Sequence, residues 1–239
     1  MSSLLTDLKR LPTGSLMREY IRASQTLERR AARNRLERYR PSTKQRVFHA
    51  AGRDHRERLF MAGNQLGKTL AGGMELAMHL SGRYPDWWDG RRFGRAVRLW
   101  AAGVTAESTR DNPQRVLVGP PQIREAWGTG AIPGDAIADI APARGVDNGV
   151  NSVVVSHASG GASVVVFKNY AQGRQKWQGE TLDGVWFDEE PPPEIYSEGL
   201  TRTNGTGGFA IVTFTPLLGL SEVVRMFLSA GELEEMATP

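Results

Sequence analysis

The amino-acid sequence predicts an α/β protein whose mainly parallel central sheet is flanked by helices, and two observations support this fold class. A short apolar segment, 58–61, runs into a glycine-rich loop and then into residues 70–80, whose apolar side chains recur at helical spacing. A second apolar segment, 185–187, ends in the acidic run 188–190. Open parallel sheets bind ligands beyond the carboxyl ends of their strands, so we expect the loop and the acidic run to meet there.

Length, composition and charge agree with a single main domain. The chain has 239 residues, 40% of them hydrophobic, which is enough to bury a full core. It has no apolar run of about 18 residues, and its first residues do not resemble a signal peptide, so we expect no membrane association. The absence of cysteine excludes disulfides and thiolate metal sites, and the formal net charge of +4 suits a polyanionic partner. The histidines are too scattered for a zinc cluster and are expected to be packing or surface residues: His49, His55, His79 and His157.

Residues 1–40 are predicted to form a basic helical arm that ends at Pro41. Its apolar side chains are too sparse to make a core, so the helix should project from the domain or pack along one edge. Two interpretations remain open: an arm that binds DNA or a partner, and a solvated helix that is merely basic. Its arginines are Arg18, Arg22, Arg29, Arg30, Arg33, Arg35, Arg38 and Arg40, and its apolar positions are Tyr20, Ile21, Leu27, Leu36 and Tyr39.

Residues 41–239 are predicted to form the main domain, which begins with a short helix. Ser42 is suited to cap a helix over 43–49, because a serine hydroxyl accepts a hydrogen bond from the first turn. Gln45 lies in that helix, just upstream of the glycine-rich loop. Its carboxamide complements the hydrogen-bonding edge of adenine, which makes it a candidate base-reading residue. The alternative is an ordinary surface glutamine.

The segment 63–69, Gly-Asn-Gln-Leu-Gly-Lys-Thr, has the composition and the setting of a phosphate-binding loop. Glycines let backbone N–H groups turn inward around a phosphate at the start of the following helix. Lys68 can reach the β- and γ-phosphate oxygens, and the Thr69 hydroxyl can ligate Mg²⁺. A strict pattern has glycine where this chain has Ala62, so a glycine-rich turn with a chance Lys-Thr pair is the alternative. The predicted nucleotide-binding residues are Gln45, Gly63, Asn64, Gln65, Gly67, Lys68 and Thr69.

The acidic run supplies the carboxylates that nucleotide hydrolysis requires. Asp188 would hold Mg²⁺, mostly through its waters, because Mg²⁺ keeps part of its hydration shell. Glu189 would polarise the attacking water, a kind of help that is typically worth about 10²–10⁴ in rate. We therefore predict Glu189 and Lys68 as catalytic residues, and Thr69 and Asp188 as metal-binding residues. The alternative is a solvated acidic helix entry ahead of the prolines 191–193.

Strands and helices alternate between the loop and the acidic run. Residues 96–102 are predicted to be a strand, and Thr105 is predicted to cap a helix that is interrupted at Pro113. The valine-rich segments 152–156 and 163–167 are separated by a turn with two glycines and predict a hairpin. We expect this hairpin to be an antiparallel insertion that leaves the main sheet undisturbed.

Three further segments complete the prediction. Residues 128–150, rich in glycine, alanine, proline and aspartate, are expected to be a surface loop. Residues 193–200 predict a helix and 208–215 predict a buried strand. That strand ends in Thr215, whose hydroxyl could sense the γ-phosphate or its attacking water and which we count among the catalytic residues. A threonine followed by Pro216 is also an ordinary way to end a strand.

Together these motifs resemble the ATPase part of the large terminase subunit of tailed double-stranded DNA bacteriophages, over most of the chain. The resemblance implies a P-loop NTPase fold with ATP and Mg²⁺ as cofactors. Gln45 falls where the adenine-reading glutamine of the family is expected, and Phe214 opens a segment that looks like its coupling motif. Many relatives carry an arginine inside the loop, where this chain has Asn64. The motifs concerned are 63–69, 84–90, 178–179 with 188–192, and 214–219.

The resemblance also implies a function and partners. Such a protein is an ATP-hydrolysing motor that moves double-stranded DNA into a capsid in the cytoplasm of the bacterial host. It acts as a ring-forming homo-oligomer on the portal protein and is recruited by the small terminase subunit. In such rings an arginine often completes a neighbour's site, and the candidates here are Arg202, Arg174 and Arg110, each of which is otherwise an ordinary surface arginine.

Large terminases resemble two-domain proteins whose second domain is a metal-dependent nuclease, and that part is expected to be absent here. The acidic residues after Pro216 follow one predicted helix and offer no aspartate cluster: Glu222, Glu232, Glu234 and Glu235. We therefore expect no DNA cleavage. Two other functions remain open, a helicase-like ATPase stimulated by nucleic acid and an inactive remnant that binds nucleotide.

Overall fold

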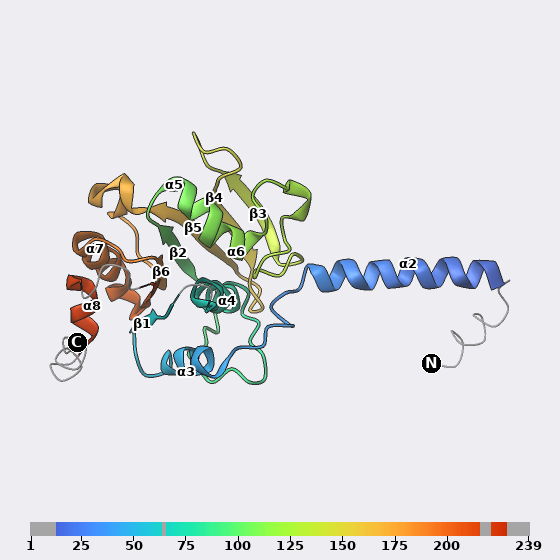
Figure 1. Ribbon diagram of the computed structural model, residues 1–239, viewed down its shortest axis with the longest axis horizontal. Helices are drawn as coiled ribbons and strands as arrows, with labels where there is room; N and C mark the ends of the chain where they lie inside the picture. Colours follow the sequence, from blue (N-terminus) through green and yellow to red (C-terminus); the bar gives the residue numbers. More distant parts are fainter. Residues whose placement is uncertain (1–12, 64–65, 216–220, 229–239) are drawn as a thin grey trace.

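The central sheet has seven strands in the order β1-β7-β6-β2-β5-β4-β3 (Figure 1). The computed structural model describes residues 13–63, 66–215 and 221–228. From β1 to β5 in this order neighbouring strands run parallel, whereas β4 and β3 are antiparallel to their neighbours. The prediction of a mainly parallel sheet is therefore confirmed. The strands are β1 Glu57–Met61, β2 Arg98–Gly103, β3 Ile137–Pro142, β4 Val150–Ser156, β5 Ala162–Asn169, β6 Gly184–Asp188 and β7 Phe209–Phe214.

Helices cover both faces of this sheet. Helix α4, which follows the glycine-rich loop, packs on one face, and α7 packs against β6 and β7 on the other (Figure 1). No helix in the described ranges is both long and apolar enough to cross a bilayer. The α-helices are α2 Thr13–Ala32, α3 Thr43–Ala51, α4 Lys68–Ser81, α5 Ala106–Thr109, α6 Arg115–Val118, α7 Pro193–Thr203 and α8 Glu222–Phe227. The shorter turns are the π-helix η1 Arg110–Gln114 and the 3₁₀ helices η2 Arg124–Ala126, η3 Tyr170–Gln172, η4 Arg174–Trp177 and η5 Asn204–Thr206.

Strand β6 shows how the two faces are filled. Successive side chains of a strand point to opposite faces. Trp186 therefore joins the core beneath α4, where it shares a cluster with Met74. Val185 and Phe187 join the second core, together with Tyr196 of α7. Because β6 is buried on both faces, its sequence is a continuous apolar run rather than an alternating one.

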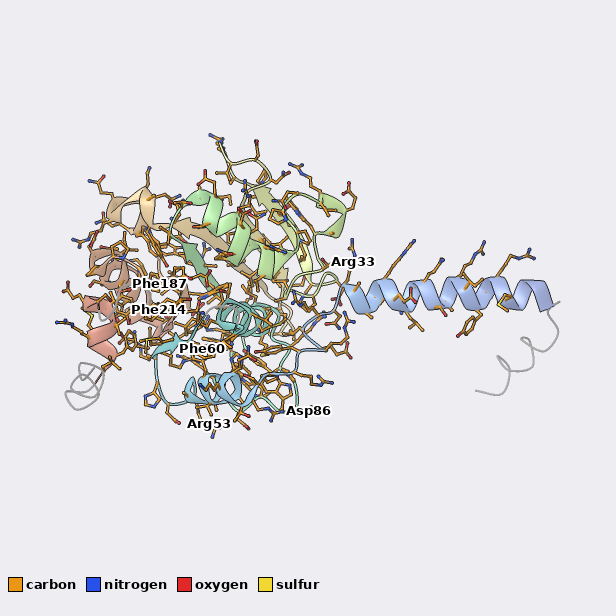
Figure 2. The ribbon with its side chains drawn as sticks, in the orientation of Figure 1. Arg33, Arg53, Phe60, Asp86, Phe187 and Phe214 are labelled. Carbon is orange, nitrogen blue, oxygen red and sulfur yellow. The ribbon has the colours of Figure 1, made fainter. Side chains whose placement is uncertain are left out.

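Helix α2 stands away from the rest of the molecule, as predicted for an arm (Figure 1). Arg33 lies where the helix meets the domain (Figure 2), and its carbonyl accepts a hydrogen bond from the amide of Gly134 at 2.8 Å. Apolar side chains of the helix are exposed, among them Tyr20 and Leu27 at 70% and 64%. The arm is thus attached at its carboxyl end, and most of its side chains over 17–32 are exposed.

The arm ends earlier than the sequence predicted. Helix α2 stops at Ala32, and residues 33–40 form turns. Leu36 and Tyr39 are 3% and 5% exposed and belong to the core beneath α4. The prediction of a helix that runs to Pro41 and contributes no core residue is wrong at this point, because burial of these two side chains overrides local helix propensity.

The prediction of a surface loop over 128–150 is also wrong. Part of this segment is strand β3, which pairs antiparallel with β4. The residues before it are buried against α6, where the amide of Ala131 donates to the carbonyl of Val116 at 2.7 Å. A Cβ on Gly130 would lie 2.4 Å from the carbonyl oxygen of Leu117. The small residues that suggested a loop are therefore what allows this segment to approach α6 so closely.

Several local predictions are confirmed. Ser42 and Thr105 cap α3 and α5, and the helix that follows Thr105 is interrupted by a π-helix at Pro113. Strands β4 and β5 form the predicted hairpin. The expectation of a separate insertion is wrong, because β5 pairs parallel with β2 and so belongs to the main sheet. Of the histidines, His49, His79 and His157 are buried and His55 is exposed, as expected for packing and surface residues.

Candidate active site

The glycine-rich loop joins β1 to α4, as predicted for a phosphate-binding loop. Gly67 precedes the helix with a φ of 77°, a left-handed conformation that glycine adopts readily. Lys68 begins the helix, is 6% exposed, and its Nζ donates to the carbonyl of Gly63 at 2.7 Å. Asn64 and Gln65 lie outside the described residues. The described part of the loop thus brings a buried lysine to the start of α4, where unpaired backbone N–H groups favour an anion.

Gln45 ties helix α3 to this loop. Its Oε1 accepts a hydrogen bond from the amide of Ser42 at 2.8 Å, and its Nε2 donates to the carbonyl of Gly67 at 3.0 Å. A carboxamide has two donor hydrogens and two acceptor lone pairs, so one of each remains for a ligand. Gln45 also borders a cavity of about 440 Å³ beside the first turns of α4, lined by Arg35, Arg38, Tyr39, Arg40, Gln45, Leu70 and Met74.

Asp188 ends β6 and is held by a chain of side-chain hydrogen bonds. It is 2% exposed, and its Oδ1 accepts from the hydroxyl of Thr213 at 2.8 Å. That hydroxyl in turn accepts from the indole Nε1 of Trp186 at 2.8 Å. The Thr69 side chain also acts on Asp188 and favours its charged form. The phosphate-binding loop and the acidic strand therefore meet, as the sequence predicted.

Burial raises the pKa of Asp188 to about 6, and the neighbouring charge of Glu189 acts in the same direction. The hydrogen bond from Thr213, the Thr69 side chain and the charge of Lys68 oppose this rise only in part. Asp188 is thus a desolvated carboxyl group with little compensating positive charge. A hard cation would supply the missing charge, and a carboxylate beside a hydroxyl is an oxygen donor set that suits Mg²⁺. The residues present therefore fit the predicted metal.

A close approach of α4 to β6 sets the distance between the loop and Asp188. A Cβ on Gly72 would lie 2.6 Å from the indole ring of Trp186. Only a glycine lets the helix lie this close to the strand. The same indole donates the hydrogen bond that orients Thr213. The Trp186 side chain therefore couples the packing of α4 to the orientation of the Asp188 carboxylate.

Glu189 follows Asp188 in an unusual backbone conformation, with a φ of 66°. Its amide donates to the carbonyl of Thr213 at 2.8 Å, and its Oε2 accepts from the amide of Thr215 at 3.4 Å. The structure thus places the predicted base beside Thr215, which directly follows β7. The remainder of the predicted coupling motif, from Pro216 onward, lies outside the described residues.

The three candidate arginines lie in ion pairs within the chain. Arg174 and Arg202 both pair with the buried carboxylate of Glu198, each at 2.9 Å. Arg110 pairs with the adjacent Asp111 at 2.8 Å. Each arginine would have to leave this partner to act on another subunit.

Sequence reasoning missed two residues of the site. Thr213 is a polar residue in a fully buried strand, and that contrast is a signal that the sequence does contain. Tyr170, which follows β5, donates its hydroxyl to the carbonyls of Glu189 at 2.7 Å and Asp188 at 3.1 Å. No pattern around Tyr170 in the sequence indicates this contact, because β5 and β6 are not adjacent in the sheet and the approach depends on the tertiary fold.

A family model matches residues 59–235, which include the loop, the acidic run and Thr215. That family is described as the terminase large subunit, T4likevirus-type, N-terminal. The chain belongs to this family. The match confirms the resemblance seen in the motifs, while Gln45 and the arm precede the matched residues.

Individual relatives agree. This terminase chain is 46% identical to the terminase large subunit of Salmonella phage P22 over 207 residues, which are 80% of the chain and 42% of the P22 protein. It is 44% identical to the terminase large subunit of Enterobacteria phage LP7 over 66 residues, 28% of the chain and 14% of that protein. The chain therefore spans less than half the length of these relatives.

A solved structure supports the fold. The large terminase from a thermophilic bacteriophage superposes with a TM-score of 0.51 at 15% identity, covering 82% of this terminase chain and 50% of that one. A second structure of the same thermophilic phage protein, in complex with ADP, has a TM-score of 0.47 over 73% of this chain and 38% of that one. The first superposition shows that the two proteins share the α/β fold.

Proposed function

We propose that this terminase domain binds and hydrolyses ATP with Mg²⁺, and that hydrolysis drives double-stranded DNA into the capsid when the domain is part of a large terminase. The observation that supports this most directly is that the Thr69 side chain acts on the buried Asp188 carboxyl group and favours its charged form. This interaction joins the end of the phosphate-binding loop to the acidic end of β6. Loop hydroxyl and strand carboxylate are the pair by which P-loop NTPases hold their metal.

The loop and Gln45 account for nucleotide binding. Lys68, whose ammonium group now donates to the Gly63 carbonyl, can exchange that acceptor for β- and γ-phosphate oxygens. Gln45 keeps one donor and one acceptor for the base, and the cavity beside it has an apolar wall formed by Leu70 and Met74. An adenine in that cavity would lie on the same side of the loop as the start of α4.

Thr69 and Asp188 would hold Mg²⁺ through a hydroxyl, a carboxylate and bound waters. When bound, the metal neutralises phosphate charge that develops during the reaction. Asp188 is already oriented by Thr213, so its carboxylate need not be reorganised to meet the ion.

Glu189 is the proposed general base. It directly follows the metal-binding carboxylate, and a base in this position accepts the proton of the water that attacks the γ-phosphate. The amide of Thr215 contacts its Oε2, so movement of the carboxylate during turnover would be felt by the segment after β7. We propose that this contact links hydrolysis to motion of the chain.

The finer elements of the function rest on the family and remain proposals. They are a ring of copies on the portal protein, recruitment by the small terminase subunit, and action in the bacterial cytoplasm. A neighbour's arginine would complete the site, and Arg174, with 63% of its side chain exposed, is the most accessible of the three candidates. We also propose that this chain does not cut DNA. The described residues contain no group of three or more His, Cys, Asp or Glu that could hold a metal.

Steady-state ATP hydrolysis by the purified chain, with and without Mg²⁺ and duplex DNA, tests this function. We expect Mg²⁺-dependent turnover that rises with duplex DNA and is lost in Lys68→Ala, whereas Lys44→Ala, an exposed lysine outside the site, serves as the matched control. Unchanged kinetics in Lys68→Ala would remove the phosphate-loop assignment, and no turnover by the wild type would indicate a nucleotide-binding remnant. Separation of a forked duplex would favour a helicase, and plasmid nicking would contradict the absence of nuclease activity.

A further inference from the structure

The backbone of Glu189 is held in a conformation that glutamate rarely adopts. Among the described non-glycine residues only Asn148 and Glu189 have a positive φ, and that of Glu189 is 66°. A left-handed conformation is unfavourable for a residue with a long side chain and persists only where the surroundings impose it. The residue concerned is the proposed base, so whatever imposes the conformation also aims the reacting carboxylate.

Tyr170 supplies one side of that restraint. Its hydroxyl donates to the carbonyl oxygen of Glu189 at 2.7 Å and shares the same hydrogen with that of Asp188 at 3.1 Å. These two carbonyls belong to the peptide groups before and after the Glu189 Cα. One donor that bridges both groups therefore restrains φ and ψ together.

Thr213 supplies the opposite side. The peptide group between Asp188 and Glu189 presents its N–H away from its carbonyl, and that N–H donates to the carbonyl of Thr213 at 2.8 Å. The peptide is thus bonded to Tyr170 through its oxygen and to β7 through its nitrogen. A peptide held from both sides cannot rotate without losing both bonds.

The position of the Tyr170 hydroxyl is itself fixed by the second core. The tyrosine is 6% exposed, and its ring lies 6.2 Å from that of Trp177 and 6.3 Å from that of Phe187. Trp177 stacks on Phe187 at 5.6 Å with an interplanar angle of 8°, and its Nε1 donates to the carbonyl of Asn169 at 3.3 Å. Burial, with the charges of the acidic run, raises the pKa of Tyr170 well above its ordinary range, so the hydroxyl keeps its proton.

We propose that Tyr170 is a positioning residue for the general base: its hydroxyl holds the Glu189 backbone left-handed and so aims the Glu189 carboxylate at the attacking water. This inference rests on the proposed ATP hydrolysis. The described hydrogen bonds of the hydroxyl go to the two carbonyls and not to the phosphate-binding loop. Its loss should therefore slow the chemical step without weakening nucleotide binding.

The variant Tyr170→Phe removes the hydroxyl and keeps the ring. We expect kcat to fall about 10- to 100-fold, the scale of a misplaced reacting group, while KM for ATP changes by less than about twofold. Tyr196→Phe is the matched control, because Tyr196 is 2% exposed and its ring lies 5.6 Å from Phe187 in the same core. Its hydroxyl bonds to Glu57 instead, so the control should keep wild-type kcat.

A double variant separates positioning from general packing. If Tyr170 acts through Glu189, then Tyr170→Phe should cause no further loss of kcat in a Glu189→Gln background. Additive losses of kcat in the double variant would overturn the proposal. So would a rise of KM in Tyr170→Phe together with a loss of kcat in Tyr196→Phe equal to that in Tyr170→Phe.

Hydrogen exchange tests whether Tyr170 holds the Glu189 backbone even if the wild-type chain does not hydrolyse ATP. In that case the proposed function fails, and the contact between Tyr170 and this backbone is still tested. In the ligand-free chain, amides over 184–190 should exchange faster in Tyr170→Phe than in Tyr196→Phe, because the peptide after Asp188 has lost one of its two anchors. Equal exchange in the two variants would show that Tyr170 does not hold this backbone.

Discussion

Asp188 is buried, accepts a hydrogen bond from Thr213 and is the proposed carboxylate ligand of Mg²⁺. Its carboxyl group is 2% exposed, and burial raises its pKa from 3.8 to about 6. The fold therefore favours the neutral form. The stability that this group contributes to the ligand-free chain is fully present below the unfolded pKa near 3.8 and is lost as the pH rises through about 6. A bound cation reverses the preference, because it favours the carboxylate.

The affinity for a Mg²⁺ complex of a non-hydrolysable ATP analogue should consequently depend on pH. We expect the dissociation constant to rise as the pH falls through about 6, because protons then compete with Mg²⁺ for Asp188. Calorimetric titration between about pH 5 and pH 8 measures it, with Asp188→Asn as the control that binds weakly and without this dependence. A constant affinity for the wild type over that range would contradict the role given to Asp188.

At the scale of elements, helix α4 is fixed by a buried ion-pair network beneath the phosphate-binding loop. Glu75 of α4 is fully buried and pairs with Arg58 of β1 and, at 2.8 Å, with His49 of α3. Burial alone would raise the pKa of Glu75, but the Arg58 charge, the hydrogen bond with His49 and the contact with His79 at 3.5 Å outweigh it and hold this pKa well below its usual value. The network thus locks three elements that surround the loop.

Removal of Glu75 should therefore be costly. We expect Glu75→Ala to lower the free energy of unfolding by about 3–5 kcal/mol, because it leaves Arg58 buried without its partner. Urea unfolding at neutral pH measures it, and Glu28→Ala, an exposed glutamate of α2, should change stability by less than about 0.5 kcal/mol. The stability that Glu75 contributes is present above the pKa of this group in the unfolded chain, and it is lost as the pH falls through the lowered pKa in the folded chain. This pH dependence is opposite in sign to that of Asp188. A Glu75→Ala protein as stable as the control would mean that the network contributes little.

The elements that sequence reasoning could predict are those whose signals are local. The loop follows from Gly67 and Lys68 between an apolar strand and an amphipathic helix, and Ser42 caps its helix through neighbours in the chain. Strand β3 could not be predicted, because its glycine- and proline-rich surroundings resemble a loop until β4 pairs with it. The contacts of Tyr170 and Glu75 were missed for the same reason, since their partners are distant in the sequence.

At the scale of the whole molecule, an arm and a domain are joined at Arg33. Most side chains of α2 over 17–32 are exposed, whereas Leu36 and Tyr39, just beyond the helix, are core residues. Whether the arm binds DNA or another protein stays a prediction. We therefore propose that the boundary between arm and domain lies nearer to residue 33 than to the predicted residue 41.

Two truncations test this boundary. Deletion of residues 1–32 should leave the unfolding free energy of the domain unchanged within about 0.5 kcal/mol, because the described side chains over 17–32 are mostly exposed and none is buried. Deletion of residues 1–40 should cost several times more, since each large apolar side chain lost from a core typically costs about 2–5 kcal/mol. Urea unfolding of the two shortened chains checks this, and equal stabilities would contradict the assignment of Leu36 and Tyr39 to the core.

The measurement that tests the central account most directly is single-turnover cleavage of Mg²⁺-bound ATP by the wild type and by Glu189→Gln, with binding measured in the same samples. The account predicts equal binding, since Glu189 is not assigned to the loop or the metal, and cleavage slower by about 10²–10⁴ in the variant. Cleavage at the wild-type rate by Glu189→Gln would show that another group activates the water and would contradict the assignment of the site.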